Sequence, residues 1–156
     1  MKFWSGVIVL FLIFVGYGRE APPVLFYNLK QEETNVRFGP SNQFPVKFSL
    51  KCRRLPVEIK QAHEEWYKIQ DSEGEEGWVH KRMVFPGAIV LVTKKIPLTK
   101  EKKTSSAVLA HLSKGVLVKL KECHNQLCRV ELKIGKKSLT GWVPEKNLWG
   151  ISAPLP

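Results

Sequence analysis

The sequence predicts an all-β protein with two small β-barrels in tandem after an N-terminal signal peptide. Two observations predict this fold. Blocks of strand-like residues recur along the 156-residue chain in one order and at a nearly constant offset, and such internal repeats indicate a duplicated module. No segment has both the length and the periodicity of an amphipathic helix. Repeats of several short strands are typical of small barrels, since closure of the sheet removes its exposed edges.

The repeat rests on short segments that occur twice. Residues 56–59 (Pro-Val-Glu-Ile) and 66–69 (Trp-Tyr-Lys-Ile) correspond to residues 117–120 and 127–130, with an offset of 61 positions. A Gly-Trp-Val signature then occurs twice with an offset of 64 positions. The difference between the offsets predicts that the hairpin before the second signature is three residues longer, with the extra length at residues 133–138.

Short runs rich in β-branched and aromatic residues, with alternating apolar and polar positions, predict the strands of each copy. These runs are residues 57–61, 66–71 and 77–80 in the first copy and residues 116–122, 128–133 and 140–143 in the second. Residues 104–112 have a composition that a helix tolerates, but the segment is too short to form an amphipathic one. Modules of this size bury little apolar area, so we expect the two barrels to pack together or to be stabilised by a disulfide.

The first 18 residues predict a secretory signal peptide. Lys2 precedes an apolar run at residues 7–15, and the small residues Gly16 and Gly18 favour cleavage after Gly18. This is the pattern of an exported chain. An uncleaved inner-membrane anchor through residues 3–17 is the alternative, although a spanning helix needs about 20 apolar residues. Both alternatives place the rest of the chain outside the cytoplasm, as a periplasmic or secreted protein. The predicted organisation is a signal peptide at residues 1–18, a linker at 19–32, a first barrel at 33–86, a second barrel at 87–151 and a tail at 152–156.

Three cysteines fit an oxidising compartment. Cys123 and Cys128 flank a polar, turn-like link between two predicted strands, and directly opposed residues of a hairpin are close enough for a disulfide. We predict this bond, and we expect a modest effect on stability because the loop that it closes is short. Cys52 is left over, and a reduced, half-buried thiol is favoured over an intermolecular disulfide.

Nothing in the sequence nominates a catalytic residue, a metal site or a cofactor site. The four histidines show no pairing that a catalytic site would need. Cys123, His124 and Cys128 fall short of the four ligands of a structural zinc site. The acidic residues between Glu64 and Glu76 lie around predicted turns, where carboxylates are usually just solvated. We therefore expect no enzyme activity and no cofactor.

Four motifs stand out in the first copy. They are residues 35–41 (Asn-Val-Arg-Phe-Gly-Pro-Ser), 55–57 (Leu-Pro-Val), 66–69 (Trp-Tyr-Lys-Ile) and 76–79 (Glu-Gly-Trp-Val). The second copy keeps residues 128–130, 141–144 and 147–150 but lacks an Arg-x-Gly-Pro opening. Together these motifs resemble bacterial Src-homology-3 domains, in the tandem arrangement found in exported proteins of Gram-negative bacteria. The resemblance covers residues 33–151.

The resemblance implies Src-homology-3-like barrels of five strands and a binding role, commonly toward peptidoglycan or peptides. We therefore expect a non-catalytic exported module for cell-envelope material, with a cell-wall glycan or peptide, or an envelope protein, as its partner. Eukaryotic relatives bind proline-rich peptides in an aromatic groove, but their Ala-Leu-Tyr-Asp-Tyr opening is absent here. A protein–protein adaptor or secreted factor that docks an anionic partner through the lysine-rich second barrel is the alternative function.

One strand places a tryptophan on an unusual face. Alternation along residues 66–69 directs Ile69 toward the core and puts Trp66 with Lys68 on the outer face. Trp66 is therefore either a platform for a sugar ring or peptide or a cover for the barrel rim. Trp78 and Trp142 belong to the Gly-Trp-Val signatures and are expected chiefly to close the barrels. The candidate ligand-binding residues are Trp66, Lys68, Arg54, Trp78 and Trp142.

The second copy carries nearly all of the excess positive charge. The chain has a formal net charge of +11, but residues 28–86 hold 10 basic and 9 acidic residues, whereas residues 87–156 hold 13 basic and 4 acidic ones. A positive field attracts polyanions and weakens with salt, so an anionic membrane surface is a further candidate partner. Export argues against nucleic acid, which a basic surface can also bind. The expected basic patch consists of Lys94, Lys95, Lys100, Lys102, Lys103, Lys136 and Lys137.

Overall fold

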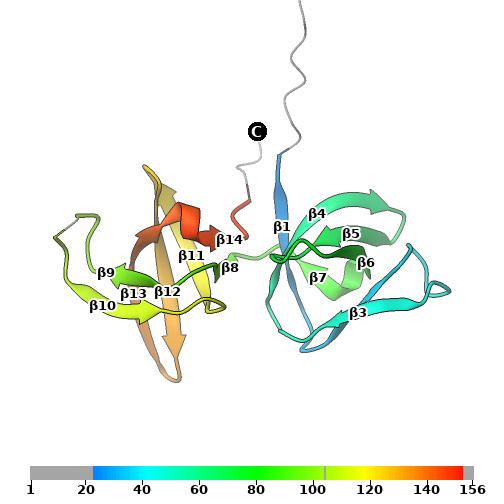
Figure 1. Ribbon diagram of the computed structural model, residues 1–156, viewed down its shortest axis with the longest axis horizontal. Coiled ribbons are helices and arrows are strands. Elements are labelled where there is room, and N and C mark those ends of the chain that lie inside the picture. Colours follow the sequence, from blue (N-terminus) through cyan, green and yellow to red (C-terminus); the bar gives the residue numbers. More distant parts are fainter. Residues whose placement is uncertain (1–22, 104, 153–156) are drawn as a thin grey trace, which may run out of the picture.

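The computed structural model describes residues 23–103 and 105–152, which form two antiparallel sheets of seven strands each. Figure 1 shows two barrels in tandem, the first coloured blue to green and the second green to red. The predicted all-β fold with two small barrels is confirmed, although each barrel has seven strands where about five were expected. No helix in the described ranges is long and apolar enough to cross a membrane. The predicted signal peptide at residues 1–18 and residues 153–156 of the predicted tail lie outside the described residues.

The two barrels repeat the same series of elements. The first contains β1 (Leu25–Leu29), β2 (Thr34–Arg37), β3 (Val46–Leu50), β4 (Pro56–His63), β5 (Trp66–Gln70), β6 (Glu76–His80), the 3-10 helix η1 (Lys81–Met83) and β7 (Val84–Phe85). The second contains β8 (Ile89–Val92), β9 (Ile96–Thr99), β10 (Val108–Leu112), β11 (Leu117–His124), β12 (Leu127–Ile134), β13 (Lys137–Pro144), the 3-10 helix η2 (Glu145–Asn147) and β14 (Leu148–Trp149). The strands lie in the order β3-β2-β6-β5-β4-β1-β7 and β10-β9-β13-β12-β11-β8-β14. The sequence repeat is therefore a structural repeat.

β1 lies inside the predicted linker, so the linker prediction is wrong for residues 25–29. The strand pairs with both β4 and β7, and Leu29 at its end is fully buried in the first core. β8 makes the equivalent pairings with β11 and β14 in the second barrel. The motif that marks the first copy begins only at Asn35, so no motif indicates the strand that precedes it.

Each barrel has a hydrophobic core of its own. Ile69 and Val130 lie in these cores, as the alternation of their strands predicts. The repeat extends to an irregularity, because β4 and β11 both shift register by one residue, at Lys60 and at Lys121. The first core consists of Leu29, Val36, Val57, Ile69, Val79 and Val84, and the second of Val90, Val92, Ile96, Leu98, Leu112, Val118, Cys128, Val130 and Val143.

The glycine of each Gly-Trp-Val signature lets a neighbouring strand come close. A Cβ atom on Gly77 would lie 2.9 Å from the carbonyl oxygen of Arg37 on β2. A Cβ atom on Gly141 would lie 2.5 Å from the carbonyl oxygen of Thr99 on β9. Any side chain at these positions would push the two strands apart, which is why glycine marks a close backbone approach inside a strand.

The β12–β13 hairpin is the lengthened one. Its pairing continues to Lys133 opposite Ser138 and Ile134 opposite Lys137. In the first barrel the equivalent pairing ends at Gln70 opposite Glu76. The predicted extra length of this hairpin is therefore confirmed.

The two barrels contact each other through the first strand of the described chain. Asn28 is 1% exposed, and its Nδ2 donates to the carbonyl groups of Arg54 (3.0 Å) and Ile89 (2.9 Å). Its Oδ1 accepts from the Ile89 N–H at 3.3 Å. The ring of Phe26 meets Trp149 edge-on, with centroids 5.0 Å apart. The expected packing of the barrels is thus present.

Candidate functional site

Trp66 lies at the start of β5 and is buried without belonging to the barrel core. The residue is 8% exposed, yet the first core cluster does not include it. It pairs with His80 on β6, and the two ring centroids are 5.3 Å apart. Trp66 is therefore on the outer face, as expected. The ring is buried and does not face the solvent, which favours the alternative that it covers the barrel rim, and its contact with a ligand stays a prediction.

A hollow of about 200 Å³ lies beside Trp66. Its other walls come from the segment around β2, from the β2–β3 loop and from the region of η1. An aromatic wall with convergent polar groups is typical of a site for a small ligand. We call this hollow the Trp66 pocket, and its lining residues are Glu33, Asn35, Arg37, Asn42, Trp66, His80, Arg82 and Met83.

Hydrogen bonds position side chains on two sides of the Trp66 pocket. Arg37 donates from Nη1 to the Phe44 carbonyl at 2.7 Å, which ties its guanidinium to the β2–β3 loop. His80 accepts at Nδ1 from the Arg82 N–H at 3.2 Å. The neutral imidazole therefore carries its proton on Nε2, where it is a hydrogen-bond donor.

The charged side chains of the Trp66 pocket have no ion-pair partners within the described ranges. Arg37, Arg82 and Glu33 take part in none of the ion pairs found there. Guanidinium groups donate to carboxylates, and a carboxylate accepts from an ammonium group. The pocket therefore presents unpaired charged groups of both signs.

Lys68 and Trp78 share the outer face of the sheet with Trp66, but they do not line the pocket. Lys68 forms an ion pair with Glu76 at 2.6 Å. The hydrogen bond from this lysine holds the pKa of the Glu76 carboxyl below its usual value. Trp78 meets the ring of His63 edge-on, with centroids 6.2 Å apart. Both side chains thus have partners within the barrel, and their contact with a ligand stays a prediction.

Arg54 and Trp142 lie elsewhere, so the five candidate binding residues do not form one site. Arg54 is at the junction of the barrels, where its carbonyl accepts from Asn28. Trp142 is on β13, and Nζ of Lys102 lies 4.2 Å from its ring centroid, a cation–π distance.

The seven lysines of the expected basic patch are all exposed, but they come from three connections. Lys94 and Lys95 lie between β8 and β9, three more lie between β9 and β10, and the last two lie at the β12–β13 turn. Figure 1 places the β9–β10 connection and the β12–β13 turn at different ends of the second barrel. The lysines of the expected basic patch therefore come from three separate segments of the second barrel, and a continuous patch stays a prediction.

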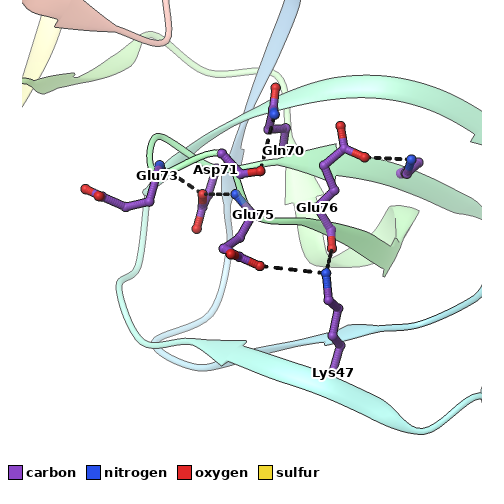
Figure 2. Close-up of polar contacts among 8 residues, drawn as sticks. Lys47, Gln70, Asp71, Glu73, Glu75 and Glu76 are labelled. Carbon is purple, nitrogen blue, oxygen red and sulfur yellow. Dashed lines mark hydrogen bonds and ion pairs between the residues drawn. The ribbon is translucent and has the colours of Figure 1, made fainter.

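The acidic residues between β5 and β6 stabilise a turn. Figure 2 shows Asp71 accepting at Oδ1 from the N–H groups of Glu73 and Glu75, both at 2.9 Å. Lys47 on β3 lies 3.7 Å from the Glu75 carboxylate and donates to the Glu76 carbonyl at 2.9 Å. Asp71 is 8% exposed, so its expected role as a solvated carboxylate is corrected to that of a turn-forming acceptor.

The predicted disulfide between Cys123 and Cys128 is present. It joins opposite residues of the β11–β12 hairpin, whose turn residues Asn125 and Gln126 both have positive φ (51° and 63°). Such a turn matches the twist of the two strands that it connects. Cys52 is a free, half-buried thiol. The described part of the chain holds no group of three or more His, Cys, Asp or Glu side chains placed to bind a metal.

A larger hollow of about 730 Å³ lies at the junction of the barrels, and the sequence did not predict it. Its apolar lining includes Phe26 from the first barrel and Leu127, Pro144, Leu148 and Trp149 from the second. Leu127 occupies the position that Trp66 has in the first barrel. The hollow depends on the contact of Phe26 with Trp149, far apart in the sequence, and no local pattern signals such a contact.

Two barrels of this strand order, with a hollow of about 200 Å³ beside the start of β5, define a tandem of small β-barrels. The family model described as bacterial SH3 domain matches residues 30–86 and again residues 92–150. These two segments make up well over half of the chain. The protein belongs to the bacterial SH3 domain family, and both copies of the domain are present.

Comparison with curated proteins finds no match. Similar solved structures include two proteins from Trichomonas vaginalis. NlpC2 is 10% identical, with 81% of this chain and 48% of that chain covered and a TM-score of 0.37. NlpC1 is 11% identical, with 89% and 50% covered and a TM-score of 0.38. The chain spans about half the length of these two structures, and a likeness this distant carries no information on function.

Proposed function

We propose that the protein is an exported, non-catalytic binding module for cell-envelope material, and that the Trp66 pocket binds peptidoglycan or its peptides. The observation that carries the proposal is the position of Trp66, a large aromatic side chain packed outside the core beside a polar hollow. A tryptophan that served only the hydrophobic core would lie on the inner face of the sheet. Aromatic rings in pockets with a few placed polar groups are a common way to bind a small ligand.

The chemistry of the Trp66 pocket favours a cell-wall peptide end. Arg37 and Arg82 supply donors for a carboxylate, and Glu33 supplies an acceptor for an amine. Peptides of the cell wall carry free carboxylates and amines on short side branches. A hollow of about 200 Å³ has room for one such group and not for an extended peptide.

Export to the periplasm or the medium is part of the proposal. It is supported by the signal-like first 18 residues and by the disulfide between Cys123 and Cys128, since disulfides persist in oxidising compartments.

Co-sedimentation with purified, insoluble peptidoglycan tests the proposal. The protein should pellet with the wall at low salt. Trp66→Leu, which installs the residue found at the equivalent position of the second barrel, should weaken binding about tenfold or more, as the loss of an aromatic anchor does. Arg82→Gln should weaken it as well, and it tests the pocket without removing a buried ring.

Trp142→Leu is the matched control, because Trp142 is the second-barrel counterpart of Trp78 and lies outside the Trp66 pocket. It should pellet like the wild type. The proposal fails if the wild-type protein stays in the supernatant, or if Trp66→Leu and Arg82→Gln both pellet unchanged while folded.

A second candidate function is an adaptor that docks an anionic partner through the second barrel. This function is supported by the seven lysines of the expected basic patch, which are all exposed. They lie in residues 87–156, a segment with a net charge of +9. Reversing the charge of Lys100, Lys102 and Lys103 should then abolish capture of an anionic envelope protein and leave wall binding intact. If instead wall binding is lost and no such protein is captured by the wild type, this candidate is wrong.

A further inference from the structure

Five basic side chains surround the junction of the two barrels. Arg54 lines a hollow of about 410 Å³ together with Lys30 and Arg53, and it also lines a hollow of about 370 Å³ together with Lys119 and Lys133. Arg54 therefore lines both hollows. Residues of the first barrel alone form one of them, and residues of both barrels form the other. We call this region the junction site.

The backbone of Arg54 adopts a conformation that arginine rarely takes. Its φ is 66°, at the second central position of a turn in which the Leu55 N–H donates to the Cys52 carbonyl at 3.3 Å. Glycine or asparagine is usual at a turn position that needs positive φ. Strained residues of this kind cluster at functional sites, because other parts of the structure must hold them in place.

Two contacts hold the Arg54 backbone. Its N–H donates to the Leu29 carbonyl at 2.8 Å, and its carbonyl accepts from Asn28 Nδ2 at 3.0 Å. The same Asn28 side chain binds both backbone groups of Ile89 in the second barrel. Arg54 is therefore placed relative to both barrels at once.

The cations of the junction site form no ion pairs in the part of the chain that the structure describes, although Lys119 lies opposite Glu131 on the neighbouring strand. Lys30, Arg53, Arg54, Lys119 and Lys133 take part in none of the ion pairs in the described ranges. Two acidic residues line the hollows, Glu32 and Glu131. Glu131 is already paired with Lys121 at 2.6 Å, so the site keeps an excess of positive charge.

We propose that the junction site binds a ligand with two or more anionic groups, phosphates or carboxylates, which bridges the two barrels. The Arg54 guanidinium can bind one anionic group through two parallel hydrogen bonds. The remaining cations, two from each barrel, flank it and meet the neighbouring groups of the same ligand. The junction site shares no lining residue with the Trp66 pocket, so this inference does not rest on the proposed function.

Titration calorimetry at low salt tests the site with two probes, inorganic tripolyphosphate and a triglutamate peptide. At least one should bind at a single saturable site, and the stronger probe identifies the anionic group. Arg54→Gly should weaken binding about tenfold or more, as expected for a lost charge-assisted contact. Because glycine suits positive φ, this variant should unfold at the same temperature as the wild type or higher, which separates lost binding from lost folding.

Lys133→Gln and Lys95→Gln form the matched pair of controls. Both remove one exposed lysine of the second barrel, but only Lys133 lines the junction site. Lys133→Gln should weaken binding severalfold, and Lys95→Gln should leave it within about twofold. Trp66→Leu should not change it. The inference is overturned if neither probe binds, if Arg54→Gly binds like the wild type, or if the two lysine variants lose affinity equally.

Discussion

At the scale of single residues, Trp66 combines a position on the outer face of the sheet with a buried ring. Alternation places Trp66 on the outer face correctly, but it cannot report that the ring is buried there. Asn42 and Arg82 line the hollow beside the ring, and no strand pattern encodes where they lie. Arg54 shows the same limit, since its positive φ follows from a turn that two other segments hold.

Cys52 gives a prediction at this scale. Burial raises the pKa of its thiol, and the charge of Glu32 adds to the rise. The thiolate is the reactive form, so the folded protein should hold less of it at pH 8 than an ordinary thiol does. Alkylation by iodoacetamide, followed by mass spectrometry, should therefore be slow at pH 8 and should accelerate as the pH rises through the raised pKa.

The same reaction in urea is the control for Cys52, because unfolding removes both the burial and the nearby carboxylate. We expect a clearly faster reaction there at equal pH. Equal rates in the folded and unfolded protein at pH 8 would show that the thiol is unperturbed.

At the scale of elements, the sequence predicts the strands that lie inside repeated motifs well. It predicts the strands outside these motifs poorly. The hairpins β5–β6 and β12–β13 follow from alternation and from the offsets between copies. The sequence predicts a linker where β1 lies, because β1 precedes the motif that begins at Asn35. Its strand character becomes evident only from its pairing with β4 and β7.

The β11–β12 hairpin gives a prediction at the element scale. Its disulfide closes a loop of sequence separation 5, for which loss of chain entropy in the unfolded state amounts to about 2 kcal/mol. Reduction by dithiothreitol should lower the free energy of unfolding by about that amount, measured by urea denaturation. Cys123→Ala is the control, since dithiothreitol should not change its stability. An identical unfolding midpoint for the oxidised and reduced wild type would contradict the prediction.

At the scale of the whole molecule, the contact between the barrels could not be predicted from the repeat. The expectation that they pack together came only from their small size. The actual connection depends on Asn28, whose counterpart in the second barrel is Leu91, so the asparagine is not a repeated feature. The apolar hollow with Phe26 and Trp149 and the junction site around Arg54 both follow from this packing.

Asn28 gives the prediction at this scale. Asn28→Ala removes three hydrogen bonds and leaves the half-buried N–H and carbonyl groups of Ile89 without this partner, a loss of about 3 kcal/mol. The two barrels should then unfold in separate transitions in scanning calorimetry, whereas the wild type should unfold in one.

Lys114→Ala is the matched control for Asn28→Ala. Lys114 also links the barrels, through an exposed ion pair with Glu73 at 3.5 Å, and an exposed pair contributes less than about 1 kcal/mol. Its unfolding should match that of the wild type. A single, unshifted transition for Asn28→Ala would show that Asn28 does not couple the barrels.

We propose that the first barrel binds the envelope ligand beside Trp66. Four tryptophans lie in the described residues, at positions 66, 78, 142 and 149, and each indole N–H gives its own signal in a nitrogen-edited NMR spectrum. Titration with a soluble peptidoglycan fragment that carries its stem peptide shows which of these signals change on binding. We predict that the Trp66 signal and the backbone amides of Asn35, Arg37 and Arg82 shift together and saturate, while the Trp142 signal stays in place. Saturable shifts confined to Trp142 or Trp149, with Trp66 unmoved, would contradict it.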